Sequence, residues 1–164
     1  MYDAKQLAAW AASQRPPAKP KRRGLMQPKY TVVYDAKVGG GYADTVNNVI
    51  HLSPGAGKHA LQHELGHLID AQFLSDGDRA YFAKMLHAPA GSWLDDRTGE
   101  GHPEGNPAEW FADYYAAATT GFKPTHRKGG VIVTNDEASY ATIGAKRLRR
   151  FQAALERLRA RHGL

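Results

Sequence analysis

His63-Glu64-Leu65-Gly66-His67 follows the pattern H-E-x-x-H, and the rest of the chain can be interpreted around it. On a helix, residues four apart lie on one face, so we expect the rings of His63 and His67 to point the same way, one turn apart. Two imidazoles in this arrangement are a common zinc-binding pair, and Glu64 can hold a water on the open side of the metal. The pattern predicts zinc-dependent hydrolysis of a carbonyl compound, with Glu64 as the general base.

A chance match to three fixed positions is rare, since 8 His and 6 Glu in 164 residues give about 0.014 expected matches. The surroundings also favour a helix that starts near Ser53-Pro54-Gly55 and runs to Phe73. Its apolar positions share one side, opposite the two histidines: Leu61, Leu65, Leu68 and Ile69. The alternative is a pair of incidental histidines on an ordinary helix.

Length and composition indicate one domain with its own core. The chain contains no cysteine, so zinc has to be held by histidine and carboxylate. No apolar run approaches the length of a membrane span, and the first residues lack a signal-peptide core. We therefore expect a soluble protein, cytoplasmic or phage-associated, and the frequent alanine and arginine are typical of a GC-rich bacterial or phage genome.

Charge is distributed unevenly along the chain. Residues 1–29 contain 7 basic residues (Lys and Arg) and 1 acidic residue, and residues 143–164 contain the same numbers. The part between them contains 8 basic and 14 acidic residues. A short helix over residues 3–14 and a linker rich in proline, lysine and arginine are predicted before Lys29. We divide the chain into this basic N-terminal helix and arm (1–29) and a folded domain (30–164). Nucleic acid is a candidate partner for the basic ends, but solvated basic segments are favoured.

Two strands are predicted before the motif helix, at residues 30–34 and 47–52, with a glycine turn at residues 39–41 between them. A strand directly before an H-E-x-x-H helix can form the sheet edge that faces the cleft, where its free backbone groups pair with an extended substrate. We expect this substrate contact from four residues: Val49, Ile50, His51 and Leu52. An ordinary internal strand is the alternative.

After the motif helix, Ser75 or Asp76 is expected to cap a short helix that ends near Leu86. The segment from His87 to Gly105 is long and loop-like, and it is our candidate for the rim that selects the substrate. Trp93 is expected either to contact substrate there or to anchor the segment in the core.

Asn106-Pro107-Ala108-Glu109 has the residue types of a helix start, with Asn at the cap and Pro at the first helical position. Glu109 can be explained as a capping carboxylate, but it is also a suitable third protein ligand for zinc. Asp113, one turn further on, can accept a hydrogen bond from the free ring nitrogen of a ligating histidine. Near the C-terminus, residues 131–133 are predicted as a short strand, and a long helix from Asp136 has an apolar stripe: Leu148, Phe151, Leu155 and Leu158.

His63-Glu64-Leu65-Gly66-His67-Leu68-Ile69-Asp70 and Glu109-Trp110-Phe111-Ala112-Asp113 together resemble the zincin metallopeptidases whose third ligand is glutamate, the gluzincins. The closer resemblance is to the catalytic domain of anthrax lethal factor and the Pro-Pro endopeptidases, and it covers about residues 30–121. A metzincin, in contrast, would need glycine and histidine in place of Asp70 and Phe73.

The resemblance implies a small α+β zincin-like domain with one Zn²⁺ per chain, held by His63, His67 and Glu109. It also implies Glu64 as the general base and Asp113 as the residue that orients a ligand. The family has an oxyanion-stabilising tyrosine seven residues before the ligand glutamate, and this chain has His102 there. We therefore expect a zinc endopeptidase acting on peptides or proteins, with His102 as the candidate oxyanion donor. The alternatives for His102 are that the role is lost, that it is the third zinc ligand in place of Glu109, or that it is an exposed loop histidine. The alternatives are a non-catalytic zinc-fold binding module and a nucleic-acid-associated zinc protease.

Overall fold

The computed structural model describes residues 28–88, 93, 106–121 and 143–162. Its elements, in chain order, are β1 (Thr31–Tyr34), β2 (Gly41–Asp44), β3 (Val49–Leu52), α2 (Lys58–Phe73), α3 (Asp76–Leu86), α4 (Pro107–Thr119) and α5 (Ala145–His162). Helices and a small sheet occur in one arrangement, so the α+β class is confirmed. Predictions for the N-terminal helix and arm, for His102 and for a strand at residues 131–133 lie outside the described residues.

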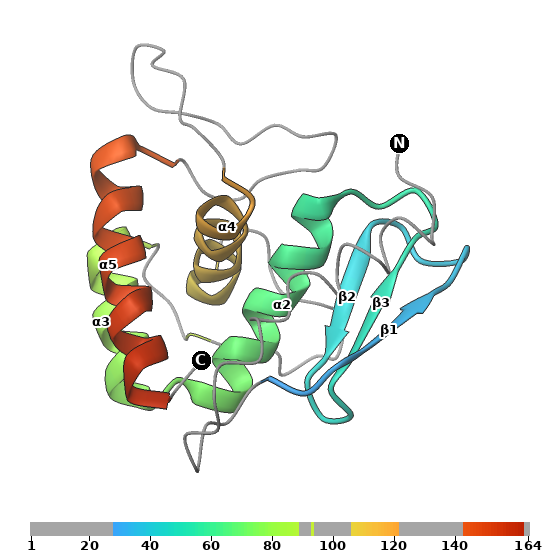
Figure 1. Ribbon diagram of the computed structural model, residues 1–164, viewed down its shortest axis with the longest axis horizontal. Coiled ribbons are helices and arrows are strands. Elements are labelled where there is room, and N and C mark those ends of the chain that lie inside the picture. Colours follow the sequence, from blue (N-terminus) through green and yellow to red (C-terminus); the bar gives the residue numbers. More distant parts are fainter. Residues whose placement is uncertain (1–27, 89–92, 94–105, 122–142, 163–164) are drawn as a thin grey trace, which may run out of the picture.

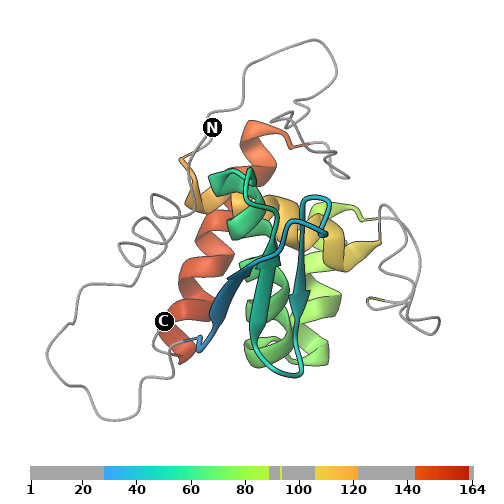
Figure 2. The same cartoon turned by 90° about the vertical axis from the view of Figure 1, so that its right-hand side faces the viewer.

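Helix α2 lies between the sheet and α4 (Figure 1). The sheet packs on one side of α2, through β2 and β3, and α4 packs closely along the other side. Helices α3 and α5 contact both α4 and each other. In the turned view both lie behind the sheet, which faces the viewer (Figure 2). The motif helix is therefore internal to the fold.

The sheet has three strands in the order β1-β3-β2, with β3 parallel to β1 and antiparallel to β2. Ile50 and Leu52 of β3 are fully buried on the face toward α2. On the opposite face His51 stacks on Tyr42 of β2, with ring centroids 4.3 Å apart. Strand β2 was not predicted, because the sequence Gly-Tyr-Ala-Asp contains few residues that favour strands.

The apolar stripe predicted for α2 is confirmed as core, since its four residues are at most 6% exposed. The helix begins at Lys58, somewhat later than the start signal at residues 53–55 indicated. The opposite face is also covered: His67 is 6% exposed, because α4 packs over the side that carries the histidines. The motif residues are thus held on both sides of the helix.

The start of α3 agrees with the sequence prediction, whereas the last helix begins later than the predicted Asp136: Ile143 and Gly144 are not helical, and α5 starts at Ala145. Ser75 caps α3, and its side chain and that of Asp78 bond to each other's backbone N–H in a reciprocal capping box. The predicted apolar stripe of α5 is buried, and it packs with α3 and α4 around a cluster of aromatic rings: Phe82, Phe111, Tyr114 and Phe151. In the part of the chain that the structure describes, no helix is both long enough and apolar enough to cross a membrane.

Candidate metal centre

A glycine within the motif allows α2 and α4 to approach closely. A Cβ atom at Gly66 would lie 2.8 Å from the Cα of Ala112, which leaves no room for any side chain there. Gly66 lies between His63 and His67 in sequence, and Ala112 lies between Glu109 and Asp113. The close contact therefore brings two histidines of one helix against two carboxylates of the other.

His63, His67 and Glu109 present three donor atoms to one point. The Nε2 atoms of His63 and His67 are 3.2 Å apart. Glu109 Oε2 is 3.0 Å from His63 Nε2, and Oε1 is 3.4 Å from His67 Nε2. Ligand atoms placed 2.0–2.1 Å from a tetrahedral zinc are about 3.3 Å apart. Each carboxylate oxygen of Glu109 thus faces one of the two histidines, and the two nitrogens and the carboxylate have the types and the approximate spacing of zinc ligands.

The carboxylate of Glu109 faces the histidines, whereas its backbone N–H receives the cap. Asn106 Oδ1 accepts a hydrogen bond from this N–H at 2.8 Å, which confirms the predicted start of α4 at Pro107. The capping and ligand explanations are therefore compatible, because they use different groups of Glu109.

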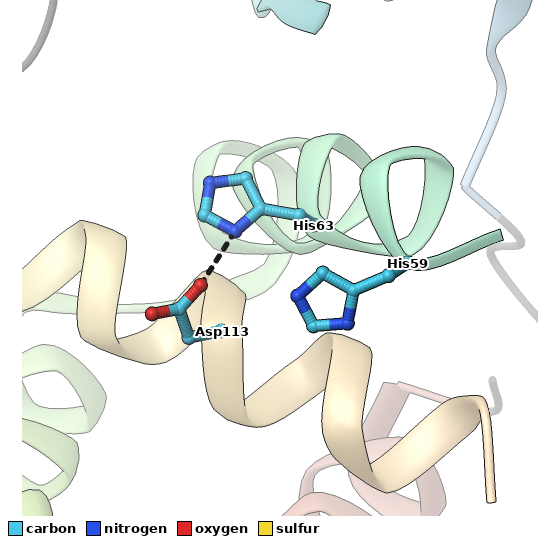
Figure 3. Close-up of side chains that lie close together, drawn as sticks. All are labelled: His59, His63 and Asp113. Carbon is cyan, nitrogen blue, oxygen red and sulfur yellow. Dashed lines mark hydrogen bonds and ion pairs between the residues drawn. The ribbon is translucent and has the colours of Figure 1, made fainter. Parts of the chain in front are cut away.

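Asp113 contacts the other nitrogen of the His63 ring. Its Oδ1 is 3.0 Å from His63 Nδ1, and Asp113 is only 1% exposed (Figure 3). A carboxylate in this position holds a proton on Nδ1 and directs the lone pair of Nε2 toward the three-donor set. The predicted orienting role of Asp113 agrees with this geometry.

The two carboxylates make this part of the α2–α4 interface favourable for positive charge. Burial lowers the pKa of His63, but its hydrogen bonds to Asp113 and Glu109 outweigh burial and raise the pKa to about 10. Burial raises the pKa of Glu109, but His63 and His67 outweigh it and hold this pKa well below its usual range. The positive charge can be carried by a proton on His63 or by a bound cation.

Glu64 lies on the sheet side of α2 and is 7% exposed. Burial raises the pKa of its carboxyl group, with His67 and His63 acting in the opposite direction. The backbone N–H of Ala43 in β2 donates to this carboxylate. A Cβ at Gly41 would lie 3.1 Å from Glu64 Cγ and 2.8 Å from Leu52 Cδ2, so the glycine provides space for the Glu64 side chain.

His59 is a residue of this region that sequence reasoning missed. It lies one helical turn before His63, close to both His63 and Asp113 (Figure 3). Burial lowers the pKa of its imidazole. The recurrence of histidine every four residues, at 59, 63 and 67, was a signal that could have found it.

The prediction that residues 49–52 form the free sheet edge is wrong. Strand β3 is central, and its backbone groups pair with β1 on one side and β2 on the other. The side chains of Ile50 and Leu52 are fully buried in the core, and that of His51 stacks on Tyr42, so they too have structural contacts. Val49 pairs with Thr31 and Asp44. Within the described sheet the edge strand beside Glu64 is β2.

Two roles were predicted for Trp93, and its contacts are those of an anchor in the core. Its indole Nε1 donates to Asp70 Oδ2 at 2.7 Å, and its ring packs against Phe111 with centroids 6.0 Å apart. Arg79 Nε bonds the other oxygen of the same carboxylate at 2.8 Å. The indole N–H is thus occupied within the protein, and a substrate contact would have to use the ring face.

Several arginines of α5 are used to attach this helix to its neighbours. Arg161 Nη2 is 2.8 Å from Asp78 Oδ1, and Arg157 Nη2 is 3.3 Å from the Tyr81 hydroxyl. These contacts give two arginines of the basic helix structural partners in α3.

No family model matches this chain, and searches of curated proteins and of solved structures find no significant match.

Proposed function

We propose that this protein is a zinc-dependent endopeptidase with a gluzincin-type ligand set of His63, His67 and Glu109. The single observation that carries this proposal is the convergence of two imidazole nitrogens and the Glu109 carboxylate, whose two oxygens each face one histidine, with separations of 3.0 to 3.4 Å that are close to the edge length of a zinc tetrahedron. Three protein ligands leave a fourth position for water or substrate, which is the usual arrangement of a catalytic site rather than a structural one.

Zinc at such a site supplies a water of lowered pKa and polarises the carbonyl of the bond to be cleaved. In this proposal Glu64 would accept the proton of the attacking water and pass it to the leaving amine. In the metal-free protein burial raises the pKa of its carboxyl group, and a zinc ion bound nearby would act in the opposite direction. Asp113 keeps His63 in one tautomer throughout.

An extended peptide is placed along β2 in this proposal. This strand runs beside Glu64, and among the described residues it pairs with β3 alone. The outer backbone groups of β2 other than the Ala43 N–H, which Glu64 uses, can therefore pair with a substrate strand. This assigns to β2 the role that the sequence had suggested for residues 49–52.

The competing proposal is a zinc-fold module that binds a partner without hydrolysis. The substitution Glu64→Gln distinguishes the two, because it keeps the size of the side chain and removes the base. We expect zinc content and melting temperature to be preserved while hydrolysis of a peptide library falls by orders of magnitude. Glu156→Gln, at an exposed position of α5, is the matched control and should cleave normally.

Cleavage should also stop when a chelator removes the metal and return when zinc is added. If the native protein with one bound zinc cleaves no peptide of a broad library, the binding module becomes the better description. Equal cleavage by the native protein and by Glu64→Gln would show that Glu64 is not the general base.

A further inference from the structure

Histidines and carboxylates alternate along the α2–α4 contact. Helix α2 presents His59, His63 and His67 at four-residue intervals, and α4 presents Asp113 and Glu109 opposite them. The proposed catalytic set uses the Nε2 side of the His63 ring. On the Nδ1 side lie Asp113 and His59 (Figure 3), and one donor atom from each of His59, His63 and Asp113 lies within 4.8 Å of the others.

We propose that His59, Asp113 and His63 Nδ1 form a second divalent-cation position that competes with the catalytic one for His63. Two imidazoles and a carboxylate are ligands that zinc, cobalt and nickel accept. In both sets the donor atoms lie within 4.8 Å of one another, and in the second set His63 Nδ1 and Asp113 Oδ1 are 3.0 Å apart. An ion at the second position has to displace the proton that His63 Nδ1 shares with Asp113, so we expect this position to be the weaker one.

The two positions exclude each other because they need different tautomers of His63. A neutral imidazole has one nitrogen with a proton and one with a free lone pair. When Nε2 ligates, Nδ1 carries the proton that it shares with Asp113. When Nδ1 ligates, Asp113 becomes a ligand and that hydrogen bond is lost. An ion at the second position therefore takes from the catalytic position both a ligand and the residue that orients it.

The test uses the full chain with the first position disabled. His67→Ala combined with Glu109→Ala removes two catalytic ligands and leaves His59, His63 and Asp113 in place. Calorimetric titration with Zn²⁺, and with Co²⁺ followed by its visible absorption, should show one ion per chain, bound at least tenfold more weakly than the native protein binds its zinc. Adding His59→Gln should weaken this binding at least tenfold again.

His87→Gln in the same background is the control, because His87 is an exposed histidine after α3 and its loss should change nothing. Failure of the double variant to bind an ion, or binding that His59→Gln leaves unchanged, would overturn the proposal. If circular dichroism shows that the double variant is unfolded, His67→Gln alone serves as the background and the same comparison applies.

A second comparison uses the otherwise native chain. His59→Gln should still bind one zinc with unchanged affinity, since His59 does not belong to the catalytic set. Loss of that zinc would assign His59 to the first position and would also overturn the proposal. Failure of the endopeptidase proposal would be seen separately, in the cleavage experiments with Glu64→Gln.

Discussion

Gly66 of α2 and Ala112 of α4 are in such close contact that a methyl group on Gly66 would lie 2.8 Å from the Cα of Ala112. Gly66→Ala must therefore push the helices apart or distort one of them. We expect the free energy of unfolding to fall by about 1–3 kcal/mol, the usual cost of overpacking, and zinc binding to weaken because the donors of the two helices separate.

Gly39→Ala is the matched control, because nothing lies within 4 Å of a Cβ at that position. Urea denaturation and zinc titration of both variants check the prediction. If Gly66→Ala has native stability and native zinc affinity, the close helix contact is not what positions the donors.

Much of the candidate site could be predicted from sequence because it depends on local geometry. The four-residue interval between His63 and His67 fixes their common face on any helix. The cap at Asn106 likewise fixes where α4 begins. That Glu109 reaches the histidines depends on the non-local contact at Gly66. The sequence left Glu109 open as a cap or a third ligand, and the resemblance to gluzincins favoured the ligand.

The sheet could be predicted only in part, since strand order depends on contacts between distant residues. The segment at residues 49–52 was recognised as a strand, but its central position follows from parallel pairing with β1. Strand β2 includes Gly41, whose small size is required by Leu52 and Glu64 and not by any local preference. Gly41 was therefore predicted as part of a turn, because the tertiary contact that requires a glycine there cannot be seen in the sequence.

Glu109→Ala should remove most of the bound zinc while the fold is kept. The Asn106 side chain bonds the backbone N–H of residue 109, so the cap of α4 survives the substitution. Elemental analysis after dialysis checks the metal, and circular dichroism checks the helices. Full zinc occupancy in this variant would require another third ligand.

Gly41→Ala should impair catalysis more than metal binding. A Cβ at this position meets Glu64 Cγ at 3.1 Å and Leu52 Cδ2 at 2.8 Å, whereas none of the three zinc ligands is among its nearest atoms. We expect kcat to fall at least tenfold, because small displacements of a general base are costly, with one zinc still bound. Steady-state kinetics and elemental analysis of the same sample test this, and parallel loss of both would contradict it.

The stability of the metal-free protein should fall as the pH rises, whereas the affinity for zinc should increase. The pKa of His63 is raised to about 10, so in the metal-free protein its proton stabilises the fold below the unfolded value near 6.5. This stabilisation is lost as pH rises toward 10, by at most about 1.4 kcal/mol per pH unit. Zinc has to displace the same proton, so its affinity should rise with pH over this range.

Chelator-treated protein unfolded by urea at several pH values between 7 and 9.5 gives the first trend, and zinc titration gives the second. His63→Gln should abolish the pH dependence of the metal-free stability in this range. A metal-free protein whose stability increases from pH 7 to 9.5 would show that His63 is not the group that holds the proton.

His102 remains the predicted oxyanion donor. His102→Ala should lower kcat by about 10²-fold with zinc content unchanged, which is the usual loss for one such donor, and His102→Tyr should restore part of the activity. Zinc loss in His102→Ala would make this residue a ligand instead. Unchanged kcat and zinc would remove it from the site.

Helix α2 is packed between the sheet and α4, so its central amides are expected to be among the last to exchange with deuterated solvent. Local opening at the periphery of the fold, for example at α5 or at the start of β1, would then leave His63 and His67 in place. The ligands would separate only when the whole domain unfolds, and the rate of global unfolding would set an upper limit on how fast heat inactivates the zinc-loaded protein.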